Sequence, residues 1–138
     1  MRVIILRGKS DCGKSTTLNL VYDELVSHPG VSASPKIILG NPSQRDFECI
    51  VTLKDTREIA FFTMGDYKNN IIDAVKKYGQ QNVEILIIAS NDEFQNHLDF
   101  ICSNYPFNII NKSIPILLNS STITVENFKD CGTILSLI

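Results

Sequence analysis

Arginine is scarce in this sequence, and no stripe of basic residues runs along it. The 138 residues include 13 lysines and arginines against 15 aspartates and glutamates, which gives a net charge of −2 at pH 7. Proteins that bind nucleic acid through its phosphates usually carry a concentrated basic surface. The composition therefore gives no support for a nucleic-acid partner.

Long apolar runs are also missing. No stretch approaches the roughly 18 apolar residues that a membrane-spanning helix needs, and the first apolar run is too short for the core of a signal peptide. Apolar residues make up 43% of the chain and charged residues 20%, which excludes a disordered or fibrous composition. We expect a single globular domain over residues 1–138 with no membrane association.

Cysteine clusters are absent as well. The four cysteines form no C-x-x-C pair and have no histidine near metal-ligand spacing; they are Cys12, Cys49, Cys102 and Cys131. Without those spacings they are interpreted as free thiols in a reducing compartment. The expected location is therefore the cytoplasm.

What the chain does contain is an alternation of short apolar runs and helical patterns. Residues 3–6 predict a strand buried on both faces, and the residues from Lys14 follow helical spacing up to the stop at 28–30. Ser90 and Glu93 have the spacing of a helix capping box. The other predicted strands lie at 36–39, 47–54, 59–64 and 83–90, with two short pieces within 107–119, and the other predicted helices begin near Tyr67, Ser90 and Thr124.

This alternation is typical of βαβ units, whose right-handed crossovers build a parallel sheet with helices on both faces. Residues 47–66 have the pattern of a hairpin whose first arm has one polar face, as an edge strand does. The predicted fold class is therefore α/β: a three-layer α/β/α sandwich with a mostly parallel central sheet and one antiparallel edge hairpin strand.

A glycine-bearing loop lies between the first strand and the first helix. In the stretch RGKSDCGKSTT, Gly8, Gly13, Lys14 and Ser15 satisfy G-x-x-x-x-G-K-[ST]. Backbone N–H groups can surround a phosphate only with positive φ and close approach, and we expect both glycines to provide these. The N-terminus of the following helix adds its own unpaired N–H groups. The loop is thus a predicted phosphate site.

In this motif the chain resembles the P-loop NTPase superfamily, which implies a bound nucleoside triphosphate, most simply ATP, with Mg²⁺. Lys14 would bridge the β- and γ-phosphates, Ser15 would place its hydroxyl on Mg²⁺, and Thr16 would meet the α-phosphate. The predicted nucleotide-binding set is Gly8, Lys9, Ser10, Asp11, Cys12, Gly13, Lys14, Ser15 and Thr16.

The resemblance also implies an acidic residue that holds Mg²⁺ at the end of a neighbouring strand. Asp66 closes the strand predicted at 59–64, and Asp92 follows a later one inside the segment with capping-box spacing. Asp66 could instead cap the helix that begins at Tyr67. We expect Asp66 to be the metal ligand and, with Lys14, a catalytic residue.

The polar end of the strand beside the loop has a further implied role. In the family, a residue at this place often senses the γ-phosphate. Here Ser90 or Asn91 could resemble it.

Other parts of a catalytic site are incomplete in the sequence. Hydrolysis commonly uses a Glu directly after the metal-binding Asp, but Tyr67 stands there, and Glu93 is better explained as a capping residue. The N-K-x-D signature by which GTPases of the family recognise guanine is incomplete here, because residues 111–114 read NKSI without the Asp. Guanine recognition is therefore unsupported. We expect an NTPase with slow or partner-dependent hydrolysis.

Two other readings remain open: a small-molecule or nucleotide kinase, and a non-catalytic nucleotide-binding switch or subunit with a protein partner or a homo-oligomer. Kinases of this family usually carry a lid with paired arginines, which this sequence lacks. Arg45 is either a charge-stabilising finger or a solvated loop residue. Arg7 either pairs with an acidic neighbour or reaches the phosphates, and Lys9 either neutralises a phosphate or faces solvent.

Overall fold

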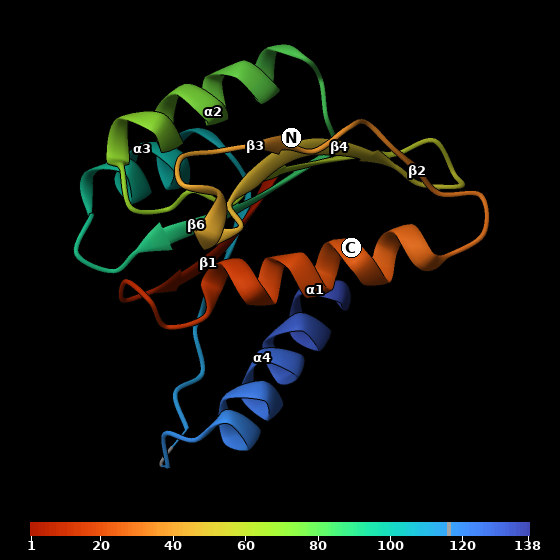
Figure 1. Ribbon diagram of the computed structural model, residues 1–138. Helices are drawn as coiled ribbons and strands as arrows, with labels where there is room; N and C mark the ends of the chain where they lie inside the picture. The colour runs from red at the N-terminus through yellow and green to blue at the C-terminus, as the bar shows by residue number, and fades with distance from the viewer. Residues whose placement is uncertain (116) are drawn as a thin grey trace.

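The computed structural model describes residues 1–115 and 117–138, except for the side chain of Lys68. One mixed sheet forms the middle layer of the molecule (Figure 1), in the strand order β2-β4-β5-β6-β1-β7, with β3 also paired to β4. The strands are β1 (Arg2–Gly8), β2 (Ser32–Ala33), β3 (Ile37–Ile38), β4 (Phe47–Thr52), β5 (Glu58–Phe62), β6 (Ile85–Asn91) and β7 (Phe107–Asn111). The helices are α1 (Lys14–Ser27), α2 (Lys68–Gln80), α3 (Asn96–Asn104) and α4 (Ser120–Leu135), with a 3-10 turn at Pro42–Gln44.

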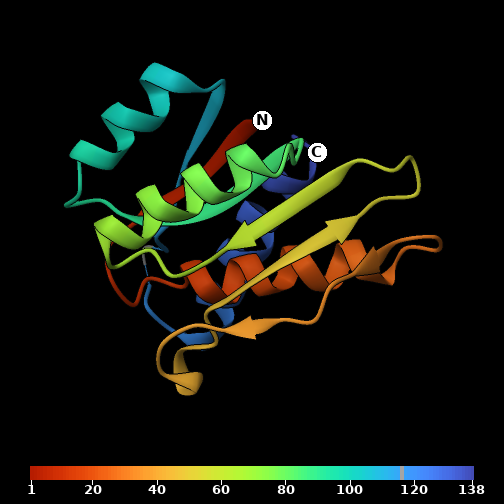
Figure 2. The same cartoon turned by 90° about the horizontal axis from the view of Figure 1, so that it is seen from above.

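Helices cover both faces of this sheet, which confirms the predicted α/β sandwich (Figures 1 and 2). Because side chains alternate along β1, Ile4 and Leu6 pack in the core under α1 and α4, while Val3 and Ile5 pack in the core under α2 and α3. In the described part of the chain, no helix is both long and apolar enough to cross a membrane.

The strand directions follow the prediction with one addition. β5, β6, β1 and β7 pair in parallel, and β4 runs antiparallel to β5 as the first arm of the hairpin. Two short strands, β2 and β3, pair antiparallel with the other side of β4, so β4 is not outermost. β2 has two exposed residues and no apolar pattern, so the sequence carried no signal for it.

The predicted capping box at Ser90 and Glu93 is wrong. Ser90 and Asn91 are the last residues of β6, because pairing with β1 continues to the Gly8–Asn91 register position. The Ser90 hydroxyl instead lies 2.6 Å from Nε2 of buried His97. The helix α3 begins only at Asn96, without a side-chain cap.

The last helix begins earlier than the predicted Thr124. Asn119 caps α4, since its side chain accepts a hydrogen bond from the Thr122 backbone N–H at 3.0 Å. Of the two strand pieces expected within 107–119, only β7 is found. Residues 112–115, 117 and 118 are not strand, and Ile116 lies outside the described residues.

A buried ion pair joins the end of β7 to α4. Lys112 Nζ lies 2.9 Å from Asp130 Oδ2, and the two side chains are only 1% and 4% exposed. The backbone N–H and the hydroxyl of Ser113 also donate to Asp130, at 2.9 and 2.7 Å. Burial raises the pKa of Asp130, but the hydrogen bonds from Ser113 and Lys112 outweigh it and hold this pKa below its ordinary value.

Replacing Asp130→Asn should destabilise the protein by about 3–5 kcal/mol, because Lys112 is then left charged and buried without its partner. Urea unfolding followed by circular dichroism measures the loss. The matched control is Lys129→Met, the neighbouring residue in the same helix. Its ion pair with Glu126 is 3.9 Å long and 68% exposed on the lysine side, so its loss should cost less than about 1 kcal/mol.

The difference between Asp130→Asn and the parent should also depend on pH. Since the folded-state pKa of Asp130 is lowered, its contribution is fully present above the unfolded-state pKa and is lost as the pH falls through the folded-state value. The two proteins should therefore converge in stability in acid. An equal cost for the two variants, or a gap that does not close, would contradict this account.

Candidate functional site

The glycine-bearing loop joins the carboxyl end of β1 to the first turn of α1. Gly13 is the N-cap of α1 and has φ of 96°, a left-handed conformation that glycine adopts without strain. A Cβ at Gly13 would lie 2.8 Å from Asn127 Oδ1. Asp11 also has positive φ, 58°, which the sequence did not indicate.

Gly8 differs from the expectation, because its φ is not positive. What it provides is space: a Cβ there would lie 2.7 Å from Cys12 Sγ and 2.9 Å from Lys112 Cβ. The two glycines of the motif therefore act differently. Gly13 makes the turn into the helix, and Gly8 lets the loop close against the segment that follows β7.

The ammonium group of Lys14 lies within the curve of the loop. Lys14 is buried, and its Nζ donates to the carbonyl oxygens of Gly8 and Lys9 at 3.0 and 2.5 Å. The N-terminus of α1 has no side-chain cap and no acidic residue in its first turn. A positive group and a set of uncapped helix N–H groups thus meet at one place, which suits an anion.

A carboxylate that the sequence analysis missed lies beside Ser15. Asp46 is only 4% exposed and accepts hydrogen bonds from the hydroxyls of Ser15 and Thr63, the latter at 3.1 Å. Burial raises the pKa of Asp46, the hydrogen bonds from Ser15 and Thr63 oppose this, and the nearby charge of Asp66 raises it further. Asp46 therefore sits in the site at an energetic cost.

The β4–β5 hairpin brings Asp46 to this place. Thr63 N donates to the Phe47 carbonyl at 3.0 Å, and Phe47 N donates to the Thr63 hydroxyl at 2.9 Å. The start of β4 is therefore tied to the end of β5. Asp46 directly precedes β4 and Asp66 follows β5, so both carboxylates lie at the end of the sheet that carries the loop.

Asp66 contacts the loop through Ser10. Its Oδ1 accepts from the Ser10 hydroxyl at 3.2 Å and from Asn91 Nδ2 at 3.3 Å, and Asn91 Nδ2 also donates to Ser10 Oγ at 3.0 Å. The helix α2 has Tyr67 as its N-cap and no side-chain cap, so Asp66 does not serve as the alternative helix cap. Asn91, not Ser90, reaches this cluster, because Ser90 is bonded to His97.

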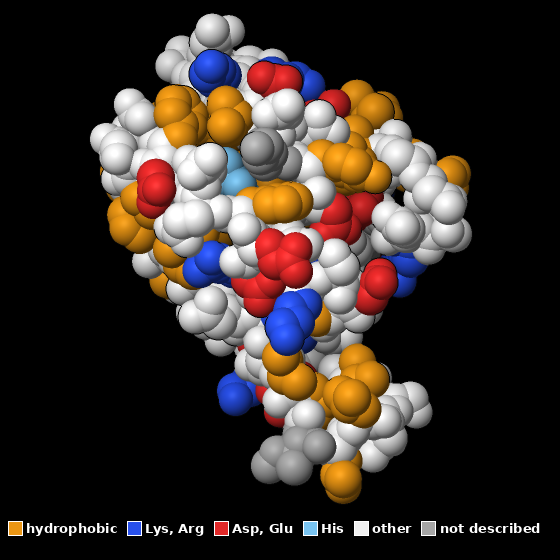
Figure 3. All heavy atoms as spheres, turned by 90° about the vertical axis from the view of Figure 1, so that its left-hand side faces the viewer, with side chains coloured by type: hydrophobic (Ala, Val, Ile, Leu, Met, Phe, Trp, Pro, Cys, Tyr) orange, Lys and Arg blue, Asp and Glu red, His pale blue; other side chains and the backbone are white. Residues whose placement is uncertain are grey.

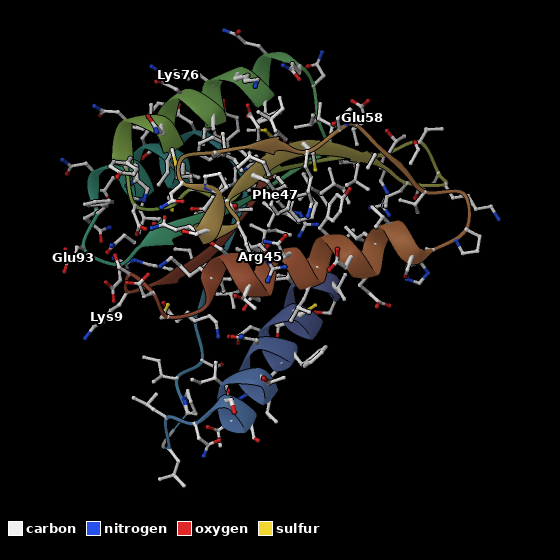
Figure 4. The ribbon with its side chains drawn as sticks, in the orientation of Figure 1. Lys9, Arg45, Phe47, Glu58, Lys76 and Glu93 are labelled. Atoms are coloured by element: carbon white, nitrogen blue, oxygen red, sulfur yellow. The ribbon has the colours of Figure 1, made fainter. Side chains whose placement is uncertain are left out.

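The neighbouring candidates lie outside this cluster. Asp92 acts through its backbone, which donates to the Gly8 carbonyl at 3.1 Å and accepts from Arg7 at 2.8 Å. Arg7 also donates to the side chain of Gln95 at 3.3 Å, so it neither pairs with an acidic side chain nor enters the site. Glu93 is exposed on the same turn (Figure 4).

Lys9 and Arg45 are both exposed. In Figure 4, the Lys9 side chain points away from the sheet at the end of the loop, and Arg45 lies beside α1. The carbonyl of Arg45 accepts from Asn19 Nδ2 of α1 at 3.0 Å, and its φ is 61°. Arg45 therefore serves the turn that leads into Asp46.

Two pockets open beside the loop. The metal-side pocket has a volume of about 300 Å³ and is lined by Asp11, Gly13, Lys14, Ser15, Thr16, Ser43, Gln44, Asp46, Thr63, Gly65 and Asp66. The β7-side pocket has a volume of about 460 Å³ and is lined by Lys9, Ser10, Asp11, Cys12, Gly13, Thr16, Lys112, Ser113, Ile114, Pro115, Leu118, Ile123, Glu126 and Asn127. The loop itself is the wall between them.

The face that carries the loop is acidic in its middle (Figure 3). Below the acidic region, the same view shows a projection with hydrophobic side chains on it. Exposed apolar residues of this part of the chain are Ile114, Leu117, Leu118, Ile123 and Val125. The loop thus lies between an acidic surface and an apolar one.

The described residues hold no group of three or more His, Cys, Asp or Glu side chains arranged to bind a metal. A cation here would be held by two carboxylates and by hydroxyl oxygens, with phosphate supplying the rest. That donor set suits Mg²⁺, which typically takes one or two carboxylates together with substrate phosphates.

Comparisons with profiles of known protein families, with curated proteins and with solved structures found no match to this chain.

Proposed function

We propose that this protein binds a nucleoside triphosphate with Mg²⁺, most simply ATP, and that the triphosphate lies on the loop from Gly8 to Thr16. The observation that carries the proposal is the Lys14 ammonium, held within the loop beside the uncapped N-terminus of α1. These groups stand at the carboxyl ends of parallel strands, where α/β sheets bind ligands. A phosphate would replace the loop carbonyls as the partner of Lys14.

The metal-side pocket fits Mg²⁺ in the chemistry of its donors. Besides burial, the charge of Asp66 raises the pKa of Asp46 and that of Lys14 lowers it, and among the described residues no lysine or arginine forms an ion pair with either carboxylate. Ser15 and Asp46 are hydrogen-bonded, so their oxygens are close enough to share one cation. Ser15 and Asp46 would hold the ion with Asp66 nearby, and bound Mg²⁺ would neutralise charge on the β- and γ-phosphates.

The β7-side pocket is the place we assign to the base. Its apolar wall consists of Ile114, Pro115, Leu118 and Ile123, and a planar base would cover side chains that are now exposed. Asn127 lies at its inner end, where it accepts a hydrogen bond from Thr17 at 3.3 Å. No sequence pattern indicates this pocket, because helix and loop residues far apart in the chain form it.

Slow or partner-dependent hydrolysis is the reaction that the site supports best. Among the described residues that line the metal-side pocket, Lys14 is the only cationic one. Charge that develops on the γ-phosphate would therefore be met by Lys14, Mg²⁺ and the N–H groups of the loop and α1, without an arginine from the described lining. A partner protein could supply that missing group. The four cysteines are free, which supports the proposed cytoplasmic location.

A kinase is the second candidate, and one observation favours it. The metal-side pocket is lined by neutral polar side chains, namely Ser43, Gln44 and Thr63, next to Asp46 and Asp66. Such groups could orient an acceptor hydroxyl, with a carboxylate near enough to take its proton.

Replacing Lys14→Ala should weaken Mg·ATP binding by roughly ten- to hundredfold or more, the usual effect of losing a charge-assisted hydrogen bond. Isothermal titration calorimetry measures the affinity. Lys54→Ala is the control, because Lys54 is exposed in the β4–β5 turn and lines neither pocket beside the loop, so its loss should leave the affinity within about threefold. Unchanged affinity in Lys14→Ala would sink the proposed phosphate site.

Replacing Asp46→Asn should remove most of the Mg²⁺ dependence of ATP binding while it raises stability at neutral pH. The amide keeps the oxygen that accepts from Ser15 and Thr63 but carries no buried charge. Because the folded-state pKa of Asp46 is raised, its ionised form destabilises the folded state at neutral pH, and this cost disappears as the pH falls. Titrations of ATP at several Mg²⁺ concentrations, with urea unfolding, measure the two effects.

Asp66→Asn should also reduce the Mg²⁺ dependence, and Asp92→Asn is the matched control that should not. Asp92 joins the site only through its backbone, which the substitution leaves in place. An Asp46→Asn protein that unfolds more easily and keeps its Mg²⁺ dependence would assign Asp46 a structural role instead.

Phosphate release from ATP distinguishes hydrolysis from transfer. The protein should release phosphate slowly when alone, and nucleosides or small alcohols should not become phosphorylated. Formation of a phosphorylated acceptor, followed by ³¹P NMR, would favour the kinase. Tight ATP binding with no turnover under either condition would favour a nucleotide-binding switch.

A further inference from the structure

The strand β7 is an open edge of the sheet. It pairs with β1 on one side, and in Figure 2 it lies beside β1 at the limit of the sheet. Its sequence is FNIIN, with no charged residue and no proline inside the strand. A strand of this kind offers its backbone to another strand.

The free hydrogen-bonding groups of β7 follow from its register. The Pro106 carbonyl accepts from Val3 N at 2.9 Å, and Lys112 N donates to the Arg7 carbonyl at 2.7 Å. Even-numbered positions therefore face β1, and the N–H and C=O groups of positions 107, 109 and 111 point away from it. Among the described residues, none of these groups has a hydrogen-bond partner.

The side chains at the same positions are apolar and exposed. Phe107 is 43% exposed and Ile109 is 39% exposed. Their register partners Val3 and Ile5 belong to the core under α2 and α3, so Phe107 and Ile109 lie on that face of the sheet, at its uncovered margin. The open edge thus carries both unpaired backbone N–H and C=O groups and two exposed apolar side chains, Phe107 and Ile109.

The opposite edge of the sheet is protected. It consists of β2 and β3, two residues each, with Pro35 between them. Short strands and proline prevent continuous pairing with another chain. Of the two edges of the sheet, the β7 edge is therefore the one that can pair with a further strand over its whole length.

We propose that β7 is a self-association edge, where the β7 of a second copy of this chain pairs antiparallel with it. A two-fold axis perpendicular to the sheet would pass through Ile109 and place Ile109 opposite Ile109 of the second copy. Phe107 would then face Asn111 of that copy. The outward groups at 107, 109 and 111 would satisfy one another across the axis.

The choice of a second copy rests on the side chains. Perpendicular two-fold symmetry leaves the α2/α3 faces of both copies on the same side of the joined sheet. Ile109 therefore meets Ile109 of the other copy, and Phe107 lies diagonal to that residue, so both side chains extend the two cores with no charge at the junction. A five-residue ladder buries less than the roughly 800 Å² per partner of a standard interface, so the dimer should be weak and concentration-dependent.

Sedimentation velocity tests this from about 1 to about 300 µM protein, a range suited to a micromolar dissociation constant. The mass should rise from 15.4 kDa toward twice that value. Ile109→Lys places two like charges opposite each other on the axis and should raise the dissociation constant roughly tenfold or more. Val125→Lys is the matched control, because Val125 is 63% exposed on α4, away from the edge, and its protein should dimerise like the parent.

Hydrogen exchange on the unmodified protein gives a second readout that does not depend on a variant. The amides of Phe107, Ile109 and Asn111 should exchange more slowly at high concentration, while that of Ile37 on the opposite edge should not change. A monomer at every concentration, or a dimer that survives Ile109→Lys without protection of these amides, would overturn the proposal. Protection that arises only with an added strand-forming peptide would overturn self-pairing in favour of a different partner.

Discussion

The parallel hydrogen-bond ladder between β1 and β6 is the constraint on which the candidate site depends. It runs without interruption from the Arg2–Ile85 pair to the Gly8–Asn91 pair. Both strands therefore end at the same level, and Asn91 emerges beside the start of the loop. Since β5 pairs with the other side of β6, the residue that follows β5 reaches the same level. The triangle of Ser10, Asn91 and Asp66 is a consequence of this register.

The fold could be predicted because the strands β1, β5 and β6 are buried and carry near-continuous apolar runs. The position of the loop could be predicted because a motif with glycine and lysine at fixed spacing stands between an apolar run and a helical pattern. The end of β6 and the start of α4 could not be predicted, since the polar residues there are placed by contacts that the apolar pattern does not record. Ser90 has the composition of a helix cap, yet β-pairing and His97 decide its conformation. Asn119 caps α4 in a polar stretch that gives no apolar signal.

Asp46 is a different kind of omission, because it directly precedes the hairpin predicted at 47–66. The family resemblance implies a metal-binding acid that follows a strand. In an antiparallel arm, however, the residue that precedes the strand lies at the edge where parallel strands end. With Glu48 paired to Phe62, Asp46 necessarily comes beside Thr63 and near Asp66. To place Asp46 at the site, one needs the direction of its strand in the sheet, which the composition does not give.

The segment after β7 lies between the proposed base pocket and the proposed dimer edge. Directly after β7, the backbone N–H of Lys112 donates to the Arg7 carbonyl and its ammonium forms the ion pair with Asp130. Residues 112–115 line the β7-side pocket. A base bound in that pocket and a second copy paired to β7 would act on opposite ends of one short, anchored stretch. If occupation of the pocket favours the position of β7 that pairs, dimerisation must strengthen ATP binding by the same factor, because coupling between two sites is reciprocal. The buried Lys112–Asp130 pair is the contact that joins the two sites, since it ties the end of β7 to α4.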